Sequence, residues 1–324
     1  MKAIQCVQWG GPRELQLVDL PPPQPAAGQV RIRVAAAGVN FPDALIVQGK
    51  YQVRPPLPFV PGTEVAGTID AVGAGVTSLQ PGDRVVAFVG LGGFAEQVCV
   101  AQEQVAPLPA GIGMAVAAGF TLAYATSQHA LAARGELKPG ETLLVLGAGG
   151  GVGLAAVELG KLAGARVIAA ASSAAKLEAA RESGADETID YAATDLREAV
   201  KALTGGRGVD VVYDPVGGAF TAAALRSLAW RGRLLVVGFA GGEIPQLPAN
   251  VLLLKEIAAI GVYWGEFARR DPAGNRTLLA QLFGWLVQGR LRPRVSKQYS
   301  LAETPQALED LLQRRAIGKL VVCP

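Results

Sequence analysis

The segment LLVLGAGGGVG at residues 143–153 constrains this chain of 324 residues more than any other feature. Its first residues are apolar over the length of a strand, a glycine-rich turn follows, and residues 154–162 (LAAVELGKL) are typical of a helix. A strand that passes through a tight glycine turn into a helix begins a dinucleotide-binding βαβ unit. Here Gly150 would let the backbone approach a diphosphate, and Gly153 would let the helix pack closely on the strand. Turns of this composition also occur as plain connections, but a second strand at residues 166–171 favours a dinucleotide site.

The end of that second strand indicates which dinucleotide binds. NAD-binding proteins usually carry an acidic residue there for the ribose 2′-hydroxyl. This chain has Ser172 and Ser173 instead, with Lys176 one turn later, and its nearest acid is Glu178. Two hydroxyls and an ammonium group would bind a 2′-phosphate, whereas a carboxylate would repel it. We therefore predict NADP(H) rather than NAD, while noting that the serines could cap a helix and Lys176 could be solvated.

Composition sets the broad class of protein. The chain is 50% hydrophobic with 41 Gly and 21 Pro, which suits a compact α/β enzyme long enough for two domains. Its net charge is only +3, and no basic cluster indicates a nucleic-acid partner. We also expect neither a signal peptide nor a membrane span. The three cysteines are odd in number and far apart, which predicts neither a disulfide framework nor a metal cluster and favours a cytoplasmic location.

Three regions follow one another along the chain. Up to about residue 120, short apolar strands alternate with Gly/Pro turns, for example at residues 30–38, 65–73 and 83–89. After residue 265 the pattern predicts a helix at 275–288, a strand at 295–299, a second helix at 304–314 and a last strand at 319–322. Because this tail is similar in composition to the first region, we expect it to fold back onto the N-terminal domain.

The middle region alternates strands with helices in the manner of a complete doubly wound parallel sheet. Ligands favour the carboxyl ends of such strands and the junctions between domains, so we expect the nicotinamide in a cleft between the two domains. The six predicted strands are residues 142–146, 166–171, 187–189, 209–213, 233–237 and 257–262.

Several blocks in this order resemble the zinc-independent quinone oxidoreductases of the medium-chain dehydrogenase/reductase superfamily, nearly end to end. The resemblance implies a GroES-like, partly open β-barrel catalytic domain at residues 1–121 and 265–324, and a Rossmann coenzyme domain at residues 122–264. It also implies a homodimer formed through the edge strand near residues 257–262. The blocks are AAGVNFPD (36–43), PFVPGTEVAGTI (58–69), PGDRV (81–85), GGFAE (92–96), AGGGVGLAAVELGK (148–161), DPVGG (214–218) and VGFAGGEIP (237–245).

The resemblance also implies which residues contact the coenzyme. Each has a plainer alternative, such as capping a turn for Asn40, bonding its own helix for Thr126, an ordinary core-edge aromatic for Tyr191, or a surface charge for Arg315. The implied contacts are Asn40 and Thr126 near the nicotinamide, Gly149, Gly150, Gly151 and Val152 at the pyrophosphate, Ser173, Lys176 and Tyr191 at the 2′-phosphate, Gly238 and Phe239 along the nicotinamide, and Arg315 reaching back to the coenzyme.

Departures from the zinc-dependent relatives predict that no metal is bound. Those relatives have a Cys where this chain has Asn40 and a His where it has Thr63, and they carry a four-cysteine structural lobe of which only Cys99 is present. A catalytic zinc needs three protein ligands, and Glu64 alone does not supply them. The sole histidine of the chain, His129, lies in a helical stretch, and we expect it to have a structural rather than a chemical role.

Tyr51 is the substrate-side candidate, together with Asn40. It lies in a Pro-rich loop, QGKYQVRPP, that resembles the cleft-lining loop of the family. Its hydroxyl could orient a carbonyl or donate a proton, or it could simply line the pocket. A second tyrosine that is frequent in the family clefts is Leu45 here, which leaves the acceptor open.

The function that these features favour is NADPH-dependent reduction of quinones by hydride transfer without zinc. A hydroquinone anion takes its proton from solvent, so no strong acid is required. The alternative is reduction of the double bond of a 2-alkenal, an enone or an enoyl thioester, where an enolate needs a hydrogen-bond donor such as Tyr51, Asn40 or the nicotinamide ribose. A further alternative is a coenzyme-binding structural or RNA-binding protein with residual activity, against which the small net charge argues.

Overall fold

The computed structural model describes all 324 residues, and the chain divides into two compact units. None of the helices combines the length and apolarity that crossing a membrane requires. Unit 1 consists of Met1–Leu122, Ala268–Val287 and Pro293–Pro324, and unit 2 of Ala123–Phe267 and Gln288–Arg292.

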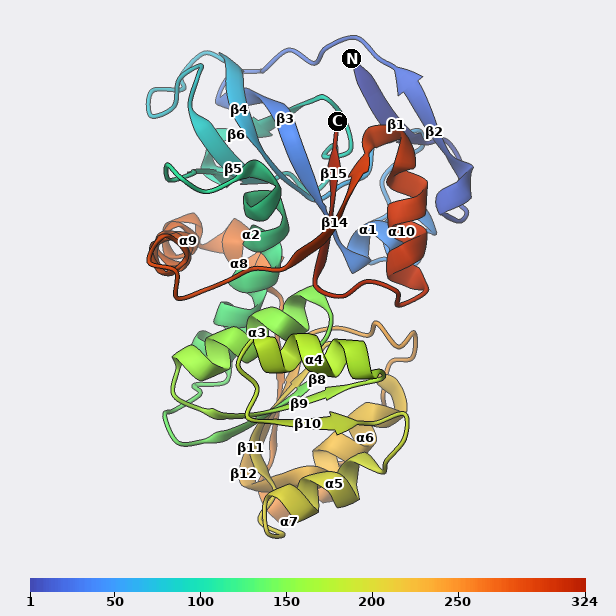
Figure 1. The fold of residues 1–324 in the computed structure, drawn as a ribbon. Helices are drawn as coiled ribbons and strands as arrows, with labels where there is room; N and C mark the ends of the chain where they lie inside the picture. The colour runs from blue at the N-terminus through green and yellow to red at the C-terminus, as the bar shows by residue number, and fades with distance from the viewer. The chain divides into compact units, whose positions relative to one another are not determined.

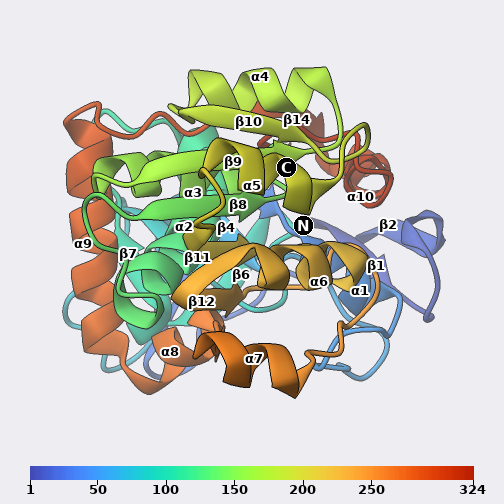
Figure 2. The same cartoon turned by 90° about the horizontal axis from the view of Figure 1, so that it is seen from below.

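Unit 2 is built on a six-stranded parallel sheet. Its strands follow one another in the order β10-β9-β8-β11-β12-β13, which confirms the predicted doubly wound sheet. Figure 2 shows β10, β9, β8, β11 and β12 in this order. All five residues of β8 are buried, as expected of a strand covered on both faces. The bounds are β8 (Thr142–Leu146), β9 (Arg166–Ala171), β10 (Glu187–Asp190), β11 (Val209–Asp214), β12 (Leu228–Val236) and β13 (Ala258–Gly261).

Helices cover both faces of this sheet. In Figure 1, α3 (Gly151–Leu162) and α4 (Ala174–Glu182) lie on one face. On the other face lie α5 (Leu196–Leu203), α6 (Gly218–Ser227) and α7 (Ala249–Lys255). The strand–helix alternation of the sequence therefore produces three layers, and the carboxyl ends of the strands open at one edge of the sheet.

Unit 1 contains a seven-stranded sheet with the order β14-β15-β3-β4-β5-β7, in which β6 also pairs with β3. A separate hairpin joins β1 (Lys2–Cys6) to β2 (Leu15–Asp19). The strands of the sheet are β3 (Gln29–Val39), β4 (Glu64–Val72), β5 (Arg84–Phe88), β6 (Gln97–Ala101), β7 (Val105–Pro107), β14 (Val295–Ser300) and β15 (Lys319–Cys323). The remaining α-helices are α1 (Phe41–Val47), α2 (Met114–Gln128), α8 (Trp264–Arg270), α9 (Pro272–Val287) and α10 (Thr304–Leu312).

The C-terminal strand returns to the N-terminal sheet, as the sequence predicted. Figure 1 shows β15 beside β3, and the two strands pair antiparallel with Leu320 opposite Val39. On its other side β3 pairs antiparallel with β4, with Gly38 opposite Glu64. Because β3 is antiparallel to both neighbours, its end lies beside the beginnings of β15 and β4. Residues from three distant parts of the chain therefore meet at one edge of this sheet.

The two units differ from the expected division of the chain at Leu122, at residues 265–267 and over one segment of the tail. Gln288–Arg292 belongs to unit 2, although the sequence places it in the tail of the first domain. The physical reason is a polar contact with α3, because the backbone N–H of Arg292 donates to the Glu158 carboxylate at 3.0 Å. The hydroxyl of Tyr124 donates to the same oxygen at 2.9 Å.

Candidate functional site

A buried cluster of polar side chains lies at the edge of the unit 1 sheet where β3, β4 and β15 meet. The ammonium of Lys319 donates to the Asn40 Oδ1 at 2.6 Å, to the Glu64 Oε1 at 2.9 Å and to the Val39 carbonyl at 3.1 Å. The Asn40 Nδ2 donates to the same Glu64 oxygen at 2.9 Å and to the Thr63 hydroxyl at 3.2 Å. All of these side chains are buried, so the polar groups satisfy one another without solvent.

A glycine makes room for this cluster. A Cβ atom at Gly38 would lie 2.3 Å from the Glu64 Oε1 and 2.3 Å from the Ala118 carbonyl oxygen. The other carboxylate oxygen of Glu64 accepts the backbone N–H of Leu122 at 2.8 Å. Any side chain at position 38 would therefore displace Glu64 from its partners.

Asp43, in the first turn of α1, is a further member of the cluster. Asn40 caps this helix, and its backbone N–H donates to the Asp43 Oδ2 at 2.8 Å, which is the arrangement of a capping box. The Asp43 Oδ1 is buried and has no hydrogen-bond partner. Burial raises the pKa of Asp43 from its ordinary value of 3.8 to about 7, although the Asn40 N–H and the charge of Lys319 act to lower it. A carboxyl group that changes charge near neutral pH is thus part of the cluster.

The donor set does not fit a metal ion. The chain brings together no group of three His, Cys, Asp or Glu side chains that could coordinate one. The ammonium of Lys319 already lies within 2.9 Å of the oxygens of Asn40 and Glu64, and this charge would repel a second cation. The absence of a catalytic metal remains a prediction of the sequence, and no step of the chemistry is derived through one.

The glycine turn of unit 2 has the form of a cradle for a diphosphate. Gly150 is the N-cap of α3, and a Cβ atom there would meet nothing closer than the Gly147 carbonyl at 3.5 Å. At Gly153, by contrast, a Cβ would lie 2.3 Å from that carbonyl and 2.8 Å from the Ala148 Cα. The first amides of a helix have no partner within it, so they can bind an anion. The cradle is open where a ligand would approach and closed where the helix packs on the strand.

The stem of Lys176 lies against this turn. A Cβ at Gly149 would be 2.5 Å from the Lys176 Cβ, so only glycine allows the lysine to cross here. Ser173 is the N-cap of α4 but makes no side-chain capping hydrogen bond, and Ser172 is exposed. The structure therefore brings Lys176 to the glycine turn, and helix capping does not occupy the Ser173 hydroxyl.

Tyr191 lies at the end of the next strand. Its backbone N–H donates to the carbonyl of Ala171, the last residue of β9, at 3.1 Å. Its ring packs on Phe220 with the ring centroids 4.3 Å apart. Tyr191 is thus an aromatic at the edge of the core that lies beside the end of β9, and its contact with the 2′-phosphate stays a prediction.

The turn after β12 lies against the turn after β11. The backbone N–H of Gly238 donates to the Asp214 carbonyl at 3.3 Å. A Cβ at Gly217 would be 3.0 Å from the Phe239 ring. Asp214 is itself buried and accepts the N–H groups of Val216 and Gly217. Gly238 and Phe239 are therefore placed at the same strand-end edge as the glycine turn, at the ends of neighbouring strands.

Two buried hydroxyl groups support the first turn of α3. Ser127 donates to the Val152 carbonyl at 3.0 Å, and its oxygen lies 2.8 Å from the hydroxyl of Tyr213 on β11. Burial raises the pKa of Tyr213, so this hydroxyl stays protonated. Thr126 is the residue before Ser127, and its contact with the nicotinamide stays a prediction.

The structure also shows what surrounds Tyr51, Arg315 and His129. Tyr51 is partly buried and packs on the core of unit 1. The guanidinium of Arg315 pairs with Asp310, through Nε at 3.0 Å, so a contact with a coenzyme would compete with this ion pair. His129 is buried with its ring stacked on Phe267 at 4.5 Å, and burial lowers its pKa. The roles expected of Tyr51 and Arg315 remain predictions.

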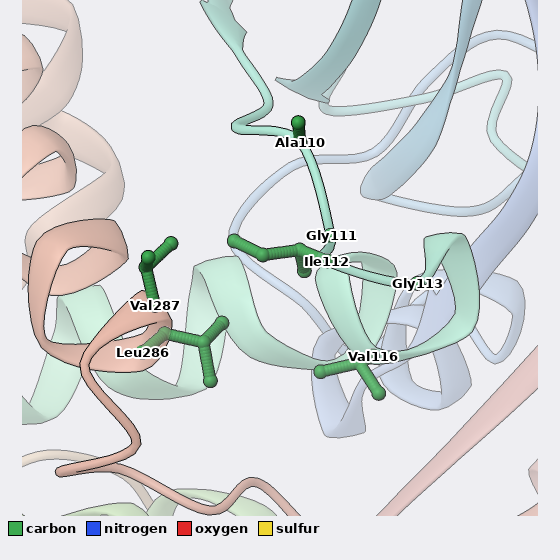
Figure 3. A pocket seen from close by; sticks show the side chains of 7 residues that line it. All are labelled: Ala110, Gly111, Ile112, Gly113, Val116, Leu286 and Val287. Carbon is green, nitrogen blue, oxygen red and sulfur yellow. The ribbon is translucent and has the colours of Figure 1, made fainter.

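Unit 1 also contains a cavity of about 280 Å³, shown in Figure 3. No side chain in its lining can donate or accept a hydrogen bond or change charge, so the cavity indicates no chemistry. The lining consists of Ala110, Gly111, Ile112, Gly113, Val116, Leu286 and Val287.

Sequence reasoning missed several members of these sites. Asp43 stands three residues after Asn40, and this capping-box spacing could have identified it. Lys319 begins a run that reads as an ordinary buried strand, KLVVC, and only the strand pairing brings it to Asn40. Ser127 and Tyr213 carry no local signal, because their contact joins a helix to a strand 86 residues away.

Comparisons with known proteins agree over the whole chain. A family model described as alcohol dehydrogenase GroES-like domain matches residues 26–110, and one described as zinc-binding dehydrogenase matches residues 151–280. Quinone oxidoreductase-like protein 2 of Bos taurus is 39% identical over 99% of this chain and 92% of that protein. The quinone oxidoreductase of Pseudomonas aeruginosa is 36% identical over 100% of this chain and 99% of its own.

A solved structure is similar to this chain over its whole length. The crystal structure of Escherichia coli quinone oxidoreductase complexed with NADPH matches with a TM-score of 0.95 and 32% identity, and covers 100% of both chains. These matches confirm the predicted combination of a GroES-like domain with a Rossmann sheet.

The two glycines of the cradle should respond differently to alanine. Gly153→Ala places a methyl group against backbone atoms, and we expect the free energy of unfolding to fall by about 2 kcal/mol or more. Gly150→Ala has open space and an ordinary extended backbone, and we expect the free energy of unfolding to change by no more than about 0.5 kcal/mol. The added methyl group would fill the open cradle, so the dinucleotide that the sequence predicts should bind at least tenfold more weakly. Urea unfolding and fluorescence titration measure the two quantities. Equal destabilisation by both substitutions would contradict this division.

Asp43 should make stability depend on pH. The folded protein keeps a proton on Asp43 that the unfolded chain releases above about pH 4, so the free energy of unfolding falls as the pH rises towards 7. The slope is at most about 1.4 kcal/mol per pH unit. Asp43→Asn resembles the protonated carboxyl and should remove this contribution, so its stability relative to the unmodified protein should rise between about pH 4 and pH 7 and level off above.

Urea unfolding across that range measures the difference. Asp19→Asn, an exposed position of the same unit, is the matched control for the loss of one carboxylate. A pH-independent difference for Asp43→Asn would show that the carboxyl keeps one charge state throughout.

Proposed function

Because this chain belongs to the quinone oxidoreductase-like family of the medium-chain dehydrogenase/reductase superfamily, we propose that it is an NADPH-dependent quinone reductase that works without a metal ion. NADPH, when bound, supplies the hydride that reduces the acceptor. The chain itself then has to bind the coenzyme, orient the acceptor and exclude competing reactions.

Unit 2 supplies the groups that would bind NADPH. The residues of the turn, Gly149, Gly150, Gly151 and Val152, would hold the diphosphate with their amides and with the N-terminus of α3. Ser172, Ser173, Lys176 and Tyr191 would hold the 2′-phosphate, and Thr126, Gly238 and Phe239 would lie along the nicotinamide. The open cradle at Gly150 and the position of Lys176 beside Gly149 support this assignment.

The saturation of the Asn40 amide is the observation that carries the choice of acceptor. Its Nδ2 already donates to Glu64 and Thr63, so Asn40 has no uncommitted hydrogen for an enolate. A quinone needs no such donor from the chain, because the hydroquinone anion is protonated by solvent. Reduction of an enal, an enone or an enoyl thioester would depend on Tyr51 or on the nicotinamide ribose.

We further propose that the protein forms a homodimer through the edge of the unit 2 sheet. Strand β13 pairs only with β12, so its outer side has unpaired backbone groups. Exposed apolar side chains gather in the neighbouring residues, with Leu253 77%, Leu254 72% and Tyr263 57% exposed. An isologous pairing of two such edges would cover both features.

We expect NADPH to be oxidised rapidly by benzoquinone or phenanthrenequinone, more slowly by a 2-alkenal or crotonyl-CoA, and equally well with a chelator. Lys176→Met removes the ammonium but keeps the stem over Gly149, and should raise the KM for NADPH about tenfold, with little change for NADH. The absorbance of the reduced coenzyme measures the rate with each acceptor and the KM of the variant. Lys201→Met, on the exposed side of α5, is the control.

Turnover of the alkenal or thioester alone would replace the proposed acceptor with an activated double bond. Equal use of NADH and NADPH would contradict the assignment of Ser172, Ser173 and Lys176.

The edge pairing can be tested at Ala259. The Val262 N–H donates inward to the Val236 carbonyl, so the period of two along a strand directs the Ala259 N–H outward. Ala259→Pro removes this donor and should yield a monomer by sedimentation or light scattering, whereas Ala259→Val keeps it and should leave the dimer intact. A dimer that persists with proline would place the interface elsewhere.

A further inference from the structure

The buried ion pair of Lys319 and Glu64 has no role in the function proposed above. We propose that these two side chains are positioning residues, which hold the side-chain amide of Asn40 in a single orientation at the acceptor site. This inference rests on the proposed function, because the resemblance to quinone oxidoreductases implies that Asn40 lies near the nicotinamide.

The two ends of the Asn40 amide meet partners of opposite kind. An ammonium group can only donate hydrogen bonds, and an ionised carboxylate can only accept them. Lys319 lies at the Oδ1 end at 2.6 Å, and Glu64 lies at the Nδ2 end at 2.9 Å. Turning the amide over would place its N–H groups against the ammonium and its oxygen against the carboxylate, so only one orientation is allowed.

Burial strengthens this selection. Lys319 and Glu64 have 8% and 1% of their side-chain surface exposed, so water does not screen either charge. All three hydrogens of the ammonium have acceptors, the third being the Val39 carbonyl at 3.1 Å. The backbone N–H of Leu122 fixes the other oxygen of Glu64 at 2.8 Å. Neither charged group can rotate away from Asn40 without leaving a buried partner unsatisfied.

Charged and neutral contacts of the amide can be separated by substitution. Lys319→Met with Glu64→Gln removes both charges together, so no unpaired charge stays buried, and it allows both amide orientations. Thr63→Val removes a neutral partner and leaves the ion pair in place. Lys161→Met with Asp186→Asn removes an ion pair of unit 2 whose side chains are 35% and 36% exposed, and it is the control for the loss of two opposite charges.

The orientation can be followed without any assay of activity. Asparagine occurs only at positions 40, 250 and 275, so selective 15N labelling gives three pairs of side-chain amide signals. Asn250→Ser and Asn275→Ser assign the other two pairs. Asn40 is the one buried asparagine, and its amide hydrogens should exchange slowly with solvent.

In the Lys319→Met/Glu64→Gln variant we expect the Asn40 amide hydrogens to exchange at least tenfold faster. The kcat with a quinone should fall at least tenfold, because the acceptor site loses its fixed geometry, while the Kd for NADPH stays within twofold. Thr63→Val should change exchange and kcat less than threefold, and the control pair should change neither. If the paired variant does not fold, Glu64→Gln alone tests the proposal. This substitution keeps the side-chain shape, and we expect it to accelerate exchange of the Asn40 amide hydrogens at least threefold.

Unchanged Asn40 signals in the paired variant, or changed signals with an unaltered kcat, would overturn the proposal. A protein that turns over no quinone even before substitution would instead contradict the proposed function. In that case the amide exchange still decides whether Lys319 and Glu64 orient Asn40.

Discussion

The antiparallel pairing of β15 with β3 is the constraint on which the candidate acceptor site depends. It places Leu320 opposite Val39 and so sets Lys319 beside Asn40. The pairing of β3 with β4 places Glu64 opposite Gly38 on the other side. Two strand registers therefore bring an ammonium, an amide and a carboxylate into one buried cluster. A shift of either register by one residue would point these side chains to the opposite face of the sheet.

In unit 2, glycines determine where neighbouring groups can lie, because they have no Cβ atom. Gly149 admits the stem of Lys176, Gly150 leaves the cradle open, and Gly153 lets α3 begin directly on the preceding turn. Gly38 has the same function in unit 1, where it leaves room for the Glu64 carboxylate. In each unit a missing Cβ determines where a charged side chain can lie.

The sequence predicted the doubly wound sheet well, because apolar strands and glycine turns are local signals. The strand at residues 142–146 and the cradle at Gly150 and Gly153 follow from neighbouring residues alone. The cluster around Asn40 could be predicted only in part, because Lys319 and Glu64 meet through a register formed 255 residues apart in the chain. The ion pair of Arg315 with Asp310 was also missed, because it forms in the turn that follows α10, where the backbone N–H of Arg315 donates to the Asp310 carbonyl.

The separation of Glu64 from Lys319 also has a consequence for the order in which the protein is assembled. All of the unit 2 sheet is encoded between them, and its parallel strands can add one after another as the ribosome extends the chain. Residues 37–39, at the end of β3, lack their strand partner on one side until β15 has been translated. During that interval the Glu64 carboxylate lacks the Lys319 ammonium, so its burial is unfavourable until β15 pairs with β3.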